Sequence, residues 1–163
     1  MRRLFMAAMV AAVALMLAAS PALAAAPHFV RADATGPNAD GTLTVTFKIA
    51  GLGDTVTTTV TASAGATALY ACRNNGGNFP SDPKKQLVSG PVSASGEFTS
   101  GKNGLITGSL TLSPPASTLD CPSGQHVVLA RVSYTNVAVS EPNAGTEPIP
   151  GTFSRIFFPQ VQP

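Results

Sequence analysis

Hydrophobic and polar residues alternate with a period of two along most of this chain, which predicts strands and not helices. Residues 42–49 show the pattern most clearly, because one parity is wholly apolar: Leu43, Val45, Phe47 and Ile49. Residues 56–72 repeat it at greater length, with apolar or small even positions and mostly Thr and Ser at odd positions. We expect one long strand here, bent or bulged near Gly65, or two strands joined there.

Further segments have the composition of strands, and turn-forming residues separate them. We expect an edge strand at 29–32, a central strand at 126–138 and a closing strand at 152–158. Residues 92–99 and 105–112 flank Ser-Gly-Lys-Asn-Gly at 100–104, which predicts a β-hairpin. The remaining segments, rich in Gly, Pro, Asn and Ser, are predicted loops: 34–40, 74–85, 113–123 and 141–150.

Seven or eight predicted strands, with no helical apolar stripe, indicate an all-β protein. The most favoured architecture is an immunoglobulin-like antiparallel β-sandwich with one disulfide. A jelly roll or a small barrel is the second choice. We expect one domain covering residues 25–163.

Residues 1–24 have the features of a signal peptide. Arg2 and Arg3 precede an apolar run at 4–19, and Ala22-Leu23-Ala24 places small residues where a signal peptidase reads them. A membrane anchor is the alternative, but the run is shorter than the ~20 residues that a spanning helix needs. We therefore expect cleavage after Ala24 and a secreted or cell-surface protein with no membrane span in its mature part.

Charge is scarce, at 11% of all residues, and the formal net charge is +2. Removal of Arg2 and Arg3 leaves eight basic residues against eight acidic ones, so the mature chain is neutral. A nucleic-acid partner would need a dense basic face, which this composition excludes.

The chain has two cysteines, so Cys72 and Cys121 have one possible pairing. Export would place them in an oxidising compartment, where disulfides form and persist. We expect a structural disulfide that ties the end of the long 56–72 strand to the turn before the 126–138 strand.

The segment directly after Cys72 is the most chemically varied loop in the chain. Its candidate binding residues are amides, an aromatic ring and two lysines: Asn74, Asn75, Asn78, Phe79, Lys84 and Lys85. One interpretation is a recognition loop for an extracellular protein or a glycan, in which Phe79 stacks and the amides hydrogen-bond. The other is a plain connection between strands, with Phe79 packed against the edge of the sandwich.

No motif predicts catalytic residues, a metal site or a cofactor. His28 and His126 lie outside any recognisable constellation, and most carboxylates fall in turns. Asp33, Asn38 and Asp40 lack the spacing of a calcium loop. We expect a non-catalytic binding or matrix-interaction module. The alternatives are a small secreted hydrolase using scattered acids and His126, or a protease inhibitor that presents the 74–85 loop.

Several stretches together resemble a group of small secreted β-sandwich proteins of high-GC, actinobacteria-like bacteria. They lie at 47–53, 70–72, 75–78, 92–96, 102–104, 121–125 and 132–136. The resemblance covers most of the mature chain and implies the sandwich fold and the Cys72–Cys121 pair. It transfers no catalytic residue and no ligand.

Overall fold

The computed structural model describes residues 26–163, so the predicted signal peptide, 1–24, lies outside the described residues. Eight strands follow one another along the described chain. They are β1 (His28–Thr35), β2 (Leu43–Ala50), β3 (Thr57–Asn74), β4 (Lys85–Thr99), β5 (Ile106–Leu112), β6 (Gln125–Glu141), β7 (Gly145–Ile149) and β8 (Phe153–Ile156). Within this range, the structure has no helix with the length and apolar character needed to cross a membrane.

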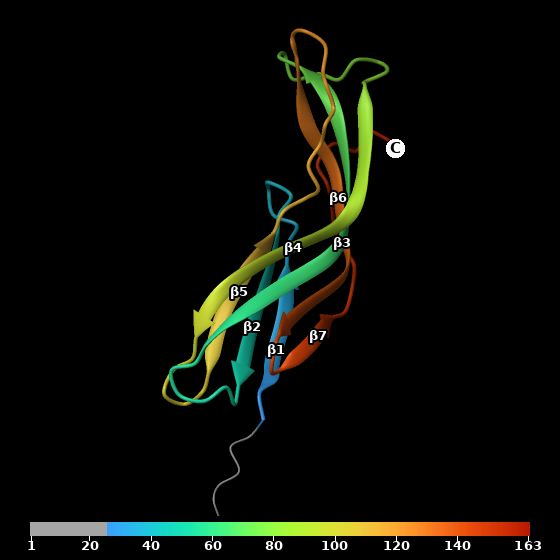
Figure 1. Cartoon of the computed structure of the whole chain (residues 1–163). Coiled ribbons are helices and arrows are strands. Elements are labelled where there is room, and N and C mark those ends of the chain that lie inside the picture. The colour runs from blue at the N-terminus through green and yellow to red at the C-terminus, as the bar shows by residue number, and fades with distance from the viewer. Residues whose placement is uncertain (1–25) are drawn as a thin grey trace, which may run out of the picture.

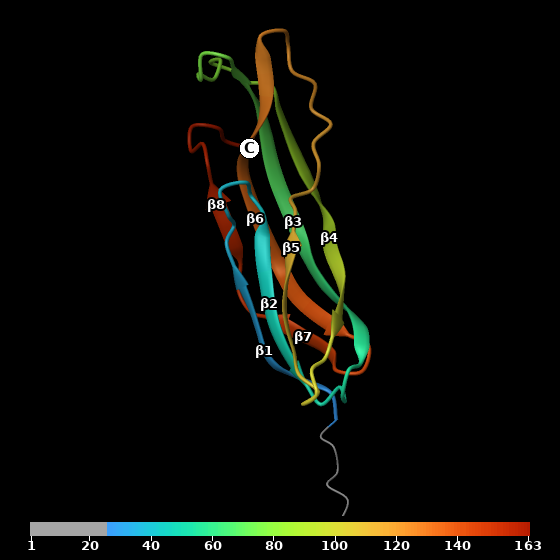
Figure 2. The same ribbon diagram turned by 90° about the vertical axis from the view of Figure 1, so that its left-hand side faces the viewer.

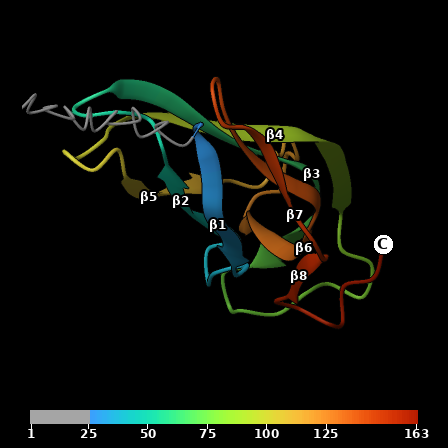
Figure 3. The same cartoon turned by 90° about the horizontal axis from the view of Figure 1, so that it is seen from below.

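The strands form two antiparallel sheets (Figure 1). The smaller has the order β1-β2-β5 and the larger β4-β3-β6-β7, with β8 pairing with β6 as well. Seen from below, β3 and β4 lie in one layer and β2 and β5 in the other (Figure 3). The predicted all-β, antiparallel sandwich is confirmed.

The core lies between the two sheets and follows the alternation in the sequence. The inward positions are apolar and almost completely buried on β2, β3, β5 and β6; they include Leu43, Val45, Phe47, Ile49, Val60, Ala62, Ala66, Ala68, Ile106, Leu112, Val132, Tyr134, Val137 and Val139. The predicted strand at 56–72 is one long strand, β3, and not two.

A bulge in β6 interrupts the pairing of β3 with β6. The register shifts between Ser63 and Gly65, and Asn136 has a positive φ of 51°. The extra residue changes the parity of β6, so Tyr134 and Val137 both point inward. A bend near Gly65 was predicted, and the bulge that accompanies it lies on the neighbouring strand.

The predicted hairpin of 92–99 with 105–112 is wrong. β4 pairs along its length with β3, whereas β5 pairs with β2 in the other sheet. The segment between them crosses from one sheet to the other and is anchored by Ser100, whose Oγ donates to the Gly53 carbonyl at 2.7 Å. Alternation shows that each strand has one buried face, but it does not show which neighbour each strand pairs with.

The predicted loop at 141–150 contains a strand, β7, and this is a second correction. Its sequence, Gly-Thr-Glu-Pro-Ile, has weak β propensity. Pairing with β6 from Val137 to Glu141 nevertheless holds it in the sheet. Tertiary pairing overrides local propensity at this edge.

The long strands β3, β4 and β6 extend past the smaller sheet at one end of the molecule (Figures 1 and 2). One face of this extension meets residues 113–124, the connection between β5 and β6, which we call the strap. Tyr70 reaches the strap and donates to the Pro115 carbonyl. The other face carries a small cluster of Leu69, Ala71 and Ala130, closed by Val161 near the C-terminus. The predicted recognition loop lies at the tip of this extension.

Candidate functional site

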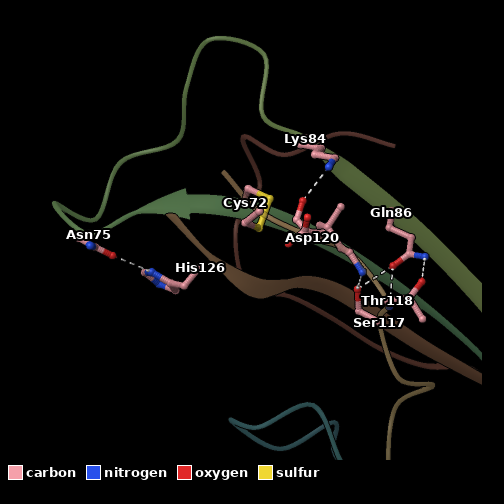
Figure 4. The surroundings of a disulfide bond; sticks show 10 residues. Cys72, Asn75, Lys84, Gln86, Ser117, Thr118, Asp120 and His126 are labelled. Carbon is pink, nitrogen blue, oxygen red and sulfur yellow. Dashed lines mark hydrogen bonds between the residues drawn. A yellow bond between two sulfur atoms is a disulfide. The ribbon is translucent and has the colours of Figure 1, made fainter. Parts of the chain in front are cut away.

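The disulfide between Cys72 and Cys121 is present, as predicted (Figure 4). Cys72 lies near the end of β3 and Cys121 in the strap, so the bond fixes the strap to the large sheet and does not join the two sheets. A disulfide of this kind is consistent with an extracellular, oxidising location.

Hydrogen bonds fix the rest of the strap to β4 (Figure 4). The Gln86 side-chain carbonyl accepts from the Ser117 hydroxyl at 2.7 Å and from the Thr118 backbone N–H at 3.0 Å. The Gln86 amide nitrogen donates to the Thr118 hydroxyl at 2.8 Å. Lys84 donates to the Asp120 carbonyl at 2.7 Å. The strap contains no helix or strand, but side chains of the extension hold it in place.

The 75–84 loop closes the β3–β4 hairpin, and its amides organise the turn itself. Asn74 accepts from the backbone N–H of Asn78 through its side chain at 2.8 Å, and its own backbone N–H donates to the Asn78 carbonyl. The Arg73 guanidinium donates to the Gly77 carbonyl at 2.7 Å. Asn74 is therefore a turn-forming residue.

Phe79 is half-buried and packs against the C-terminal segment. Its ring lies edge-on to Phe158, with centroids 5.1 Å apart, and both rest against the Leu69–Val161 cluster. The Arg73 guanidinium lies 5.7 Å from the Phe79 ring centroid and 4.9 Å from that of Phe158. This geometry matches the interpretation in which Phe79 packs against the edge of the sandwich, rather than standing free to stack on a ligand.

The two lysines of the loop also hold the structure together. The Lys85 ammonium donates to the Gln162 carbonyl at 2.8 Å, which ties the C-terminal segment to β4, just as Lys84 ties the strap. The six predicted binding residues do come together at one end of the molecule. Asn75 and Asn78 are exposed, and each side chain makes only one contact, at 3.4 Å. These contacts are longer than the hydrogen bonds of the two lysines, at 2.7 and 2.8 Å.

The two histidines lie apart from carboxylate partners within residues 26–163. The exposed His126 has its Nδ1 3.4 Å from the side-chain oxygen of Asn75, and His28 contacts the Ala26 carbonyl. Asp40 accepts from the hydroxyl and the backbone N–H of Thr42, and these hydrogen bonds hold its pKa below the ordinary value. Asp33 pairs with Arg31.

Asn38 donates to Thr42 and Thr44, so it serves the turn before β2. In the described part of the chain, no three His, Cys, Asp or Glu side chains gather as metal ligands would.

Glu141, at the end of β6, is the one buried carboxylate among the described residues, with 2% of its surface exposed. It accepts from the Thr58 hydroxyl at 2.6 Å and from the backbone N–H groups of Asn143 and Ala144. Burial raises the pKa of Glu141, but these hydrogen bonds outweigh burial and hold the pKa below its ordinary value. The Glu-Pro-Asn-Ala-Gly sequence signals a turn, yet nothing in it signals that the carboxylate is buried.

Rows of hydroxyl groups cross the outer face of the large sheet, which we call the hydroxyl face. The strand registers align them across four strands in two rows: Ser95, Thr61, Ser140 and Thr146; and Ser89, Thr67, Ser133 and Ser154. Within the rows, Thr61 and Ser95 are hydrogen-bonded at 2.7 Å, and Thr67 and Ser89 at 3.0 Å. The Thr-rich parity of β3 is visible in the sequence, but this alignment depends on long-range register.

No family model, curated protein or solved structure matches this chain.

Proposed function

We propose that this chain is a non-catalytic binding module that works outside the cytoplasm, with an extracellular protein or a glycan as its partner. The hydroxyl face is the observation that carries this proposal. It is an ordered surface whose two rows contain no charged, aromatic or large apolar side chain. Such a surface suits recognition through many neutral hydrogen bonds, each of modest strength.

Secretion, or attachment to a cell surface, fits two features of the chain. The Cys72–Cys121 bond needs an oxidising compartment to persist. The sequence of residues 1–24 has the charged start, apolar run and small-residue end of a signal peptide. The resemblance to small secreted proteins of high-GC bacteria supports the same placement.

We also propose that the connectivity is immunoglobulin-like. The strand orders β1-β2-β5 and β4-β3-β6-β7 support this, because in that fold the first, second and fifth strands share a sheet opposite the third, sixth and seventh. Three features depart from the pattern. The fourth strand, β4, pairs with β3 in the large sheet instead of joining the sheet of the first, second and fifth strands. β8 continues the large sheet beside β6, and the disulfide lies within the extension instead of between the sheets.

The neighbours of His126 favour a binding function over a hydrolytic one. A hydrolase built on His126 requires a carboxylate that orients or activates the imidazole. The side chain beside His126 is the neutral amide of Asn75. The protease-inhibitor alternative requires Lys84 or Lys85 to be presented to an enzyme, but both donate to backbone carbonyls of their own chain.

A parallel screen for binding and turnover tests the proposal. Purified residues 25–163 are applied to an array of glycans and extracellular proteins, and then incubated with the same ligands in solution. We expect retention on the array without release of hydrolysis products. Turnover by the wild-type protein that His126→Ala abolishes would contradict the proposal and favour the hydrolase.

A further inference from the structure

Two shallow hollows meet in the middle of the hydroxyl face, between its two rows. One, of about 390 Å³, is lined at the surface by Ser63, Gly65, Pro91, Ser93 and Asn136. The other, of about 290 Å³, is lined by Asn136, Ala138, Pro148, Pro150 and Gly151. Asn136 borders both, so the two hollows adjoin at this residue, and together we call them the trough, which crosses β4, β3, β6 and β7.

The registers explain why the sheet is hollowed at this place. Gly65 lies opposite Pro91 on β4 and Thr135 on β6, so the centre of the sheet has no side chain there. Further out, β7 ends at Ile149 and β8 begins at Phe153, so the second hollow lies where the chain passes from one strand to the other. The trough therefore follows from the backbone arrangement and not from one loose side chain.

The β6 bulge places an amide in the centre of the trough. Asn136 has a positive φ of 51°, a conformation that few residues other than glycine adopt. Its side chain is exposed and takes part in no side-chain hydrogen bond among the described residues. Bulges commonly redirect a side chain towards a functional surface. Here the amide offers both a donor and an acceptor to a ligand in the trough.

The lining of the trough selects a class of ligand. Hydroxyl groups at Ser63 and Ser93 and the Asn136 amide both donate and accept, so they match a ligand that carries hydroxyl groups. No charged side chain lines either hollow, so a charged ligand would lose water without gaining an ionic partner. Proline rings at 91, 148 and 150 give small apolar surfaces for the C–H face of a sugar ring.

We propose that this trough binds a neutral carbohydrate chain lying across the strands, with Asn136 at its centre. Four strands spaced ~4.8 Å apart give a trough ~15 Å long, which holds several linked sugars rather than one. This inference rests on the proposed binding function and adds the ligand class and the place.

Two substitutions test the trough and leave the fold intact. Asn136→Gly removes the amide and keeps a backbone that glycine adopts freely. Gly65→Val places a side chain on the floor of the trough. It fits there, because a Cβ would lie 3.4 Å from the nearest atom, the Thr135 hydroxyl oxygen. Thr111→Val, on the outer face of the smaller sheet, is the matched control. Thermal unfolding of all three checks that the fold is preserved.

The ligands are cellohexaose, laminarihexaose and mannohexaose, with oligogalacturonate as the charged comparison, and affinity is measured by isothermal titration calorimetry. We expect the wild type to bind at least one neutral oligosaccharide in preference to oligogalacturonate. Asn136→Gly should bind it about tenfold more weakly, as the loss of one or two hydrogen bonds implies. Gly65→Val should weaken binding at least as much, because its side chain occupies the floor of the trough. Thr111→Val should bind like the wild type.

The inference fails if no neutral oligosaccharide binds, or if oligogalacturonate binds more tightly. It also fails if a ligand bound by the wild type binds both trough variants equally well. That last result would leave the proposed binding function standing, whereas a protein that binds nothing on the glycan and protein array would contradict the proposed function itself.

Discussion

Single residues of this protein are constrained mainly by close contacts in the core and by buried polar groups. Gly108 on β5 lies where Phe98 of β4 meets Phe47 of β2, with ring centroids 5.0 Å apart in an edge-to-face arrangement. Tyr134 is fully buried and donates to the Gly41 carbonyl at 2.8 Å, and burial raises its pKa well above the ordinary value. Such positions leave little room for substitution.

Gly108→Ala should destabilise the fold. A Cβ at this position would lie 2.5 Å from Phe98 and 2.8 Å from Phe47, so both rings would have to move. We expect a loss of about 2 kcal/mol in the free energy of unfolding, measured by urea denaturation. Gly90→Ala is the control, because its Cβ would meet nothing within 4 Å. Equal stability of both variants would show that the aromatic contact is looser than described.

Glu141 should make stability depend on pH. Its pKa is lowered in the folded protein, so its stabilising effect is present in full above the ordinary pKa of 4.5 and is lost as the pH falls through the folded value. Glu141→Gln keeps the size but loses charge-assisted hydrogen bonds, at a cost of about 2 kcal/mol near neutral pH. Urea denaturation from pH 7 to pH 3 should show a smaller pH dependence for the variant. An unchanged pH dependence would assign the effect to other groups.

Among the elements, the extension of β3, β4 and β6 is stabilised by the two segments that cover its faces. The strap and the C-terminal segment cover its two faces, and Gln86, Lys84 and Lys85 hold them there. Phe79 belongs to the loop but contributes to this cover through Phe158. The loop thus connects the two covers, through Lys84 to the strap and through Phe79 to the C-terminal segment.

Phe79→Ala should loosen the attachment of the loop to the C-terminal segment. Removing a half-buried ring from the contact with Phe158 should lower the free energy of unfolding by about 2 kcal/mol. Hydrogen exchange should speed up in residues 75–84 and 157–161 before it changes in β2 or β5. Asn75→Ala, an exposed neighbour, is the control. If Phe79→Ala matched it in exchange rates, the ring would have no structural role.

The sequence was most informative about elements with one buried parity. The alternation in β2 and along most of β3 predicted the strands and their inward residues correctly, because burial on one face imposes a period of two. In β6 it predicted the strand, but the bulge reverses the parity, so the inward positions Val137 and Val139 do not follow from the alternation. Pairing partners were harder to predict, as the β4–β5 error shows, since pairing depends on contacts between distant residues. β7 was missed because a neighbouring strand stabilises it, and its own residues do not.

The candidate site was less predictable than the fold. The sequence located a polar loop, but its contacts turned out to be internal: Lys84 with Asp120 and Phe79 with Phe158. The bulge in β6 that exposes Asn136 was not predicted, because it depends on how β6 pairs with β3. Alignment of hydroxyls across strands likewise depends on register, which composition does not encode.

At the scale of the whole molecule, the disulfide limits how far the unfolded chain can expand. Cys72 and Cys121 are 49 residues apart, so the loop that they close is long. Loss of the bond in the double variant Cys72→Ser/Cys121→Ser should lower the free energy of unfolding by about 4 kcal/mol in the chain-entropy description. Thermal unfolding with and without reductant checks this, and a reduced wild type should behave like the double variant. A stable reduced protein would mean that the strap is held chiefly by Gln86 and Lys84.

Pro91 on β4 has a consequence for how copies of this protein meet one another. β4 is a 15-residue strand at the edge of the large sheet, and a chain in which only 11% of residues are charged has little charge repulsion to keep such edges apart. Proline lacks the N–H that a neighbouring strand would need, and it sits near the middle of this edge. It divides the edge into two shorter stretches, which makes strand-by-strand polymerisation harder. The same residue that borders the trough thus also interrupts the edge at which two copies of this protein could pair strand to strand.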